Sequence, residues 1–210
     1  MKFTSRSVLI YIAVNFPISF IFLALAAITS NTHQPFSILS TQMSQTGSPN
    51  ANPSGWFFFS IGLWYGGIIM IPLNLYFLRR TKSIGIQGHL FPSIMFILAS
   101  IGTFMVGLFP TVVSYTMHLV SAVLGLGFYG LGFLIFFFML LVQDKKSLLL
   151  PYAFYLPFVT FLILTQSISL VNNLIPADGT FLSLALWEWS LFFSIVFMVI
   201  SFTYLLREKS

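Results

Sequence analysis

Two ionisable side chains, His118 and Glu188, have the types and positions that could do chemistry in this sequence. Each lies near the start of a long apolar run, and Glu188 is the one carboxylate within such a run. An imidazole near a carboxylate can hold a polar ligand or act as an acid–base pair. In a bilayer an ionisable group is costly, about 2.5–3.5 kcal/mol for Asp, Lys or Arg at a span centre. Glu188 is therefore expected to face a bundle interior or a wet cavity and to have a partner.

Two further residues complete the predicted site. Gln166 lies in the apolar run before that of Glu188, and Trp187 directly precedes Glu188. We predict that His118, Glu188, Gln166 and Trp187 form a polar ligand-binding pocket. Two other interpretations stay open: a structural hydrogen-bond clamp between the helices that carry these residues, and a catalytic or proton-carrying pair.

Several chemistries have little support. The chain has no cysteine, so thiolate metal sites and cysteine nucleophiles are excluded. A zinc site needs three or four converging ligands, whereas His33 and His89 fall on opposite sides of the predicted membrane, so no metal or other cofactor is expected. Gly125-x-Gly127-x-x-Gly130 matches the dinucleotide fingerprint, but no strand precedes it, and helix packing is the expected role.

A serine hydrolase is the remaining catalytic possibility. Ser114 or Ser121 could act with His118 and Glu188 as a Ser–His–acid set. Serine is common in this sequence, and no nucleophile-elbow motif is present. The sequence therefore favours a protein that is not an enzyme.

The composition places these residues in a membrane. Of the 210 residues, 58% are hydrophobic and 6% are charged, whereas soluble domains carry about 25% charged residues. The apolar runs are long, which indicates membrane-spanning helices and not the short alternating strands of a barrel. The formal charge of +5 comes from basic residues beside the apolar runs, so it predicts membrane topology and not a nucleic-acid partner.

We predict an all-α, polytopic bundle of six transmembrane helices in a single membrane domain, 1–210. The first apolar run is longer than the core of a signal peptide and is expected to be retained. The segment 30–54 is polar but uncharged, the composition of a solvated loop. The spans are expected at about 8–28, 56–78, 90–109, 115–142, 148–171 and 181–206.

The basic residues orient the bundle. With six spans, all nine Lys and Arg residues fall on the side that holds both termini. The positive-inside rule then places both termini in the cytoplasm, in a protein of the cell (plasma) membrane. In this arrangement His118 and Glu188 lie in the outer half, with Glu188 about 10 Å along its helix.

Small residues follow His118 at helical spacing. Ser121, Ala122 and Gly125 continue this face, which reaches Gly132. Small side chains let a neighbouring membrane helix approach closely. The hairpin that contains His118 is therefore the predicted centre of the bundle.

This hairpin carries a family resemblance. Gly107-Leu108-Phe109-Pro110, followed eight residues later by His118 and then by small residues, resembles the membrane family called domain of unknown function 998, which is similar to the Frag- and DRAM-like six-helix proteins. The resemblance covers about 54–142 and implies a six-helix fold. It implies no agreed activity, although some of the wider group are associated with lipid handling or membrane trafficking.

These observations predict an integral membrane protein that is not an enzyme and binds a lipid or a partner membrane protein through an outer-leaflet polar pocket. The alternatives are a membrane-embedded, lipid-modifying enzyme that uses His118 and Glu188, and a small transporter. The expected partners are membrane lipids and other membrane proteins.

Overall fold

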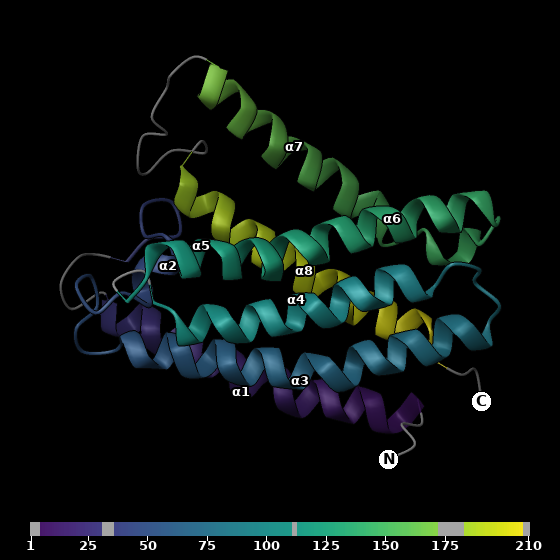
Figure 1. Ribbon diagram of the computed structural model, residues 1–210, viewed down its shortest axis with the longest axis horizontal. Coiled ribbons are helices and arrows are strands. Elements are labelled where there is room, and N and C mark those ends of the chain that lie inside the picture. The colour runs from purple at the N-terminus through teal and green to yellow at the C-terminus, as the bar shows by residue number, and fades with distance from the viewer. Residues whose placement is uncertain (1–4, 31–35, 111–112, 172–182, 208–210) are drawn as a thin grey trace.

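The computed structural model describes residues 5–30, 36–110, 113–171 and 183–207, and every regular element in these ranges is a helix (Figure 1). The predicted all-α class is thereby confirmed for this part of the chain. The elements are α1 (Ser5–Ser30), α2 (Met43–Thr46), α3 (Trp56–Ser83), α4 (Leu90–Leu108), α5 (Tyr115–Ala122), the π-helical turn η1 (Val123–Gly127), α6 (Phe128–Val142), the 3₁₀ turn η2 (Lys146–Leu148), α7 (Tyr152–Val171) and α8 (Leu184–Leu205).

In the part of the chain that the structure describes, five helices are long and apolar enough to cross a bilayer, which makes the chain an integral membrane protein. They fall at five of the six predicted positions. The second predicted span was expected to end at residue 78, but its helix continues through three basic residues, whose long side chains can reach the polar interface. The five segments are Arg6–Ser30, Trp56–Ser83, Leu90–Leu108, Tyr115–Val142 and Ala185–Leu205.

The other predicted span, 148–171, corresponds to α7. This helix begins at Tyr152, directly after Pro151, and a proline is accommodated at a helix start because the N–H groups there have no intrahelical partner. Its described apolar stretch, Tyr152–Phe161, is shorter than a span, so the sixth crossing stays a prediction. Figure 1 shows α7 leaving the end of α6 and diverging from the other long helices.

The start of α1 and the end of α8 lie at the same end of the molecule, beside the α3–α4 and α6–α7 connections (Figure 1). We call this the basic end, because Arg79, Arg80 and Lys82 lie in the last turns of α3 and Lys145 lies in the α6–α7 connection. The Nε of Arg80 donates to the carbonyl oxygen of Leu206 at 2.7 Å, so α3 satisfies an otherwise unpaired carbonyl at the end of α8. The opposite end carries α2, and we call it the cap end after residues 36–55, which are described below.

A polar network lies inside the bundle. The Nδ2 of Asn74 in α3 lies 2.7 Å from the carbonyl oxygen of Phe96, 2.7 Å from Ser100 Oγ and 2.9 Å from the Tyr129 hydroxyl. The Ser100 and Tyr129 oxygens are themselves 3.0 Å apart. All of these groups are buried, and together they join α3, α4 and α6.

The small face after His118 packs closely against α4, as predicted. A Cβ added to Gly102 of α4 would lie 2.3 Å from the backbone nitrogen of Gly125, and one added to Gly132 would lie 2.6 Å from the Phe96 ring. Backbone therefore meets backbone where α4 crosses η1. The π-helical turn falls at this crossing, where the ordinary i→i−4 pattern is interrupted.

The connection between α1 and α3 folds back over the helices. We call residues 36–55 the cap. The prediction of a solvated loop is wrong here, because Met43, Thr46 and Asn52 are buried. The Nδ2 of Asn52 donates to the carbonyl oxygens of Ala26 at 2.9 Å and Thr46 at 2.8 Å. Uncharged polar side chains can thus be buried by hydrogen bonding to backbone, which composition alone does not predict.

Candidate functional site

Glu188 lies in the second turn of α8, which begins after Ser183. The Ser183 hydroxyl accepts a hydrogen bond from the Leu186 N–H at 3.1 Å and so caps the helix. This start directs the half-buried Glu188 side chain toward the cap. Its carboxylate accepts from the Ser44 N–H at 3.0 Å and from the Ser44 hydroxyl, whose Oγ lies 3.1 and 3.2 Å from the two carboxylate oxygens.

His118 lies in the first turn of α5, where the Ser114 hydroxyl accepts from the Met117 N–H at 3.3 Å. The His118 ring is buried, and its Nδ1 lies 2.9 Å from the carbonyl oxygen of Phe109. A carbonyl oxygen can only accept, so Nδ1 carries the proton in this contact. His118 thus joins the two arms of the α4–α5 hairpin.

His118 and Glu188, the two central residues of the predicted pocket, do not bind each other directly. The two lie near enough to interact electrostatically, but neither a hydrogen bond nor an ion pair joins them in the described part of the chain. Each group has another partner, because the cap supplies donors to Glu188 and the end of α4 supplies an acceptor to His118. Glu188 therefore fastens the cap to α8 and does not clamp α8 to the fourth span.

Trp187 and Gln166 are the other two residues of the predicted site. Trp187 is half-buried on α8. Gln166 lies on α7, and its side chain is outside the described residues. Of the candidate nucleophiles, the Ser121 hydroxyl donates to the carbonyl oxygen of Met117 at 2.6 Å, and Ser114 caps α5. Neither serine hydroxyl is hydrogen bonded to the His118 ring, so the possible Ser–His–acid set is not assembled.

Trp189 is the tryptophan that reaches the cap. Its indole Nε1 donates to the carbonyl oxygen of Thr41 at 2.9 Å, and the residue is buried. It follows Glu188 directly, so two consecutive residues of α8 bind the same segment of the cap. The predicted site includes Trp187, on the other side of Glu188, and not Trp189. The choice between them depends on which face of α8 meets the cap.

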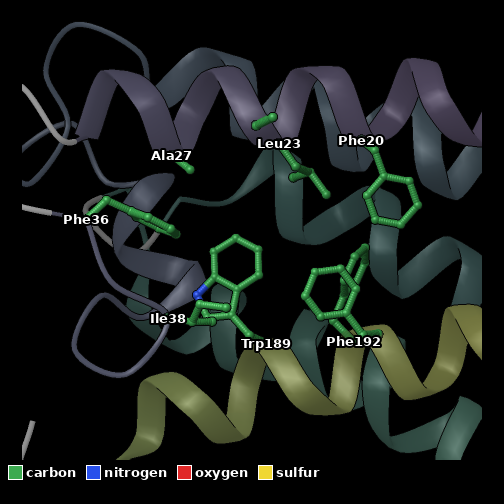
Figure 2. Close-up of a pocket in the computed structure, with 9 residues that line it drawn as sticks. Phe20, Leu23, Ala27, Phe36, Ile38, Trp189 and Phe192 are labelled. Carbon is green, nitrogen blue, oxygen red and sulfur yellow. The ribbon is translucent and has the colours of Figure 1, made fainter. Parts of the chain in front are cut away.

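An apolar groove lies beside these contacts, between α1 and α8 (Figure 2). Its volume is about 210 Å³. Figure 2 shows α1 along one side, α8 along the other, and the side chains of the cap at one end. The lining residues are Phe20, Leu23, Ala24 and Ala27 of α1, Phe36 and Ile38 of the cap, and Trp189, Phe192 and Phe193 of α8.

Aromatic ring contacts close both ends of the groove. At the cap end, the ring centroids of Phe36 and Trp189 are 5.9 Å apart in an edge-to-face arrangement. At the deeper end, Phe20 contacts Phe192 at 6.0 Å and Phe193 at 6.2 Å. The Phe20 contacts join α1 to α8, and the Phe36 contact joins the cap to α8.

The lining determines what the groove can bind. The nine residues carry one polar side-chain group, the Trp189 N–H, and this group is bonded to Thr41. A polar ligand would find no partner among these side chains. In the part of the chain that the structure describes, no group of three His, Asp or Glu residues could hold a metal ion. The groove therefore suits a hydrocarbon chain.

Comparison of the chain with protein-family models, with curated proteins and with solved structures finds no match. The resemblance to the family called domain of unknown function 998 therefore stays a prediction.

Proposed function

We propose that this chain is a lipid-binding integral membrane protein that is not an enzyme and holds one acyl chain of a membrane lipid in the α1–α8 groove. The proposal moves the binding site from the predicted polar pocket to the apolar groove beside it. Trp189, which lines the groove, follows Glu188 directly on α8, so the two places are adjacent.

The groove itself carries the proposal. If the groove of about 210 Å³ stood empty, the side chains that line it would lose van der Waals contacts on one side. The groove lies between two membrane-spanning helices, so the nearest apolar material is the lipid around them. A cavity of about 150 Å³ accommodates benzene, so 210 Å³ has room for a segment of one chain.

In this proposal, packing contacts and not transfer from water favour an acyl chain in the groove over one in the surrounding bilayer. Lipid tails are as apolar as leucine, so a chain gains no hydrophobic free energy on moving from bilayer to groove. It gains contact with aromatic rings on three sides, and the protein avoids an unfilled space.

The proposed orientation puts the groove in the outer leaflet. All nine Lys and Arg residues fall on one side of a six-span arrangement, which favours a cytoplasmic basic end in the cell membrane. The groove and the cap then belong to the opposite leaflet. Membership of the domain of unknown function 998 family is part of this proposal, and the lipid handling attributed to some of its wider relatives agrees with it.

Photolabelling tests the proposal. The protein is placed in nanodiscs of palmitoyl-oleoyl phosphatidylcholine with increasing amounts of a fatty acid that has a diazirine at its chain end, and the labelled residues are mapped by mass spectrometry. We expect saturable labelling of groove residues. Ala24→Trp puts a large side chain into the groove and should lower the labelling to the non-saturable background.

Ala13→Trp is the matched control. Ala13 is an exposed alanine on the same helix and does not line the groove, so saturable labelling should persist. Labelling that never saturates, or that is equally spread over the exposed faces of α3 and α1, would show that the groove holds only annular lipid.

A further inference from the structure

Two consecutive residues of α8 fasten the cap where it covers the groove. Glu188 accepts from Ser44, and Trp189 donates to Thr41. The Trp189 ring also lines the groove, so one residue belongs to both the cap contact and the groove wall. Displacement of the cap from α8 would therefore alter the groove directly.

The other half of the cap is fastened independently. Asn52 is fully buried and donates to the carbonyl oxygens of Ala26 and Thr46. Gly55 lies against Thr29, since an added Cβ would come within 1.8 Å of the Thr29 hydroxyl oxygen. This half is tied to α1 and does not depend on α8.

The two groove residues of the cap, Phe36 and Ile38, lie in the half that α8 holds. Loss of the Ser44 and Thr41 bonds to α8 would leave the Asn52 bonds in place and weaken the attachment of the segment that carries Phe36 and Ile38. The cap thus has a fixed side and a releasable side, and the releasable side forms one end of the groove.

We infer that Glu188 is a positioning residue for lipid binding: through Ser44 it holds the cap closed over the groove and so controls exchange of the bound chain. This inference rests on the proposed function, because it concerns access to the same groove. The chemical class of the ligand is the same, a single acyl chain. The inference adds that the Glu188–Ser44 contact retains this acyl chain in the groove.

The absence of cysteine makes the cap easy to follow. Spin labels on cysteines at Ser40 in the cap and at the exposed Ile200 of α8 report the cap-to-α8 distance in nanodiscs. A single narrow distance is expected for the otherwise unchanged chain. Glu188→Leu removes the acceptor and should add a second, broader population.

Lipid exchange is measured on the same variants. Release of the diazirine fatty acid should be about fivefold faster in Glu188→Leu, the factor expected for a lost hydrogen bond of typical net strength. Glu188→Gln keeps a carbonyl oxygen that can accept from the Ser44 N–H, so it should restore both the narrow distance and slow release. This rescue separates positioning from general destabilisation.

Ser44→Ala is the milder variant if Glu188→Leu fails to fold. It removes the hydroxyl donor but leaves the backbone N–H, so a smaller change in the same direction is expected. Ser54→Ala, a substitution of an exposed serine in the same cap, is the matched control and should change neither distance nor release.

The outcomes distinguish the inference from the proposed function. A cap that stays closed in Glu188→Leu and Ser44→Ala overturns the inference. So does a cap that opens while saturable groove labelling and release remain unchanged, and in that case the proposed function stands. If the unchanged chain shows no saturable labelling, the proposed function fails, and the inference fails with it.

Discussion

The two sides of this bundle are packed by different means. On one side, α4 meets η1 so closely that a Cβ on Gly102 would lie 2.3 Å from the Gly125 nitrogen. On the other side, α1 and α8 meet through ring contacts such as Phe20 with Phe192 at 6.0 Å, and the groove lies between them. The close backbone packing fixes the arrangement of α4 against η1, whereas the α1–α8 side leaves space for a bound molecule.

The polar contacts show the same difference. Asn74 is buried and links three membrane helices to one another. Glu188 is half-buried and links one helix to a loop segment. A helix-to-helix network resists any relative movement of the bundle, while a contact between helix and cap can break without disturbing the helices.

The largest effect is expected at the α4–η1 crossing. Gly102→Leu forces side-chain atoms into the backbone of Gly125 and should cost about 3 kcal/mol or more of unfolding free energy, the upper end for overpacking. Little folded protein should remain in gel filtration. Gly127→Ala is the control, because its Cβ meets only Val123 Cγ1 at 3.7 Å. Equal loss in both variants would contradict the close-packed side.

Asn74→Leu should have the next largest effect. It leaves the Tyr129 and Ser100 hydroxyls without their amide donor inside the bundle, a loss of about 1–2 kcal/mol. Unfolding in sodium dodecyl sulfate measures the change. Asn50→Leu, on the exposed part of the cap, serves for comparison and should be nearly neutral. If Asn74→Leu left the free energy of unfolding unchanged, the Asn74 network would not stabilise the bundle.

Ser44→Ala should lower stability less than Asn74→Leu, by about 0.5–1 kcal/mol, because the backbone N–H still donates to Glu188. The same unfolding titration measures it. A loss as large as that of Asn74→Leu would mean that the cap contact belongs to the rigid framework and not to a releasable segment.

Ala24→Trp should have the smallest effect on stability, within about 0.5 kcal/mol, because its side chain enters existing space. Its effect should appear in lipid labelling instead. A large stability loss would indicate that the groove cannot accept added volume, which would weaken the comparison between the two sides.

Five of the six spans were predictable because apolar length alone determines which segments can cross a bilayer. The small face from Ser121 to Gly132 was also predictable, since helical spacing places these residues on one side. Glu188 was identified from the free-energy cost of an ionisable group in the bilayer alone, because a carboxylate in an apolar run needs a partner. These features depend on local sequence.

The partners of Glu188 were not predictable in the same way. Ser44 lies in a loop segment whose path depends on buried side-chain contacts such as those of Asn52. The choice of Trp189 over Trp187 depends on the rotation of α8 about its axis. The groove depends on the register of α1 against α8. A single sequence contains no direct signal for any of these relations.

The most direct test of the account is native mass spectrometry of the protein ejected from nanodiscs. If the α1–α8 groove binds one lipid, we expect one retained lipid in the unchanged chain and in Ala13→Trp, and none in Ala24→Trp. Retention of the same number of lipids by Ala24→Trp and by the unchanged chain would contradict a binding groove between α1 and α8.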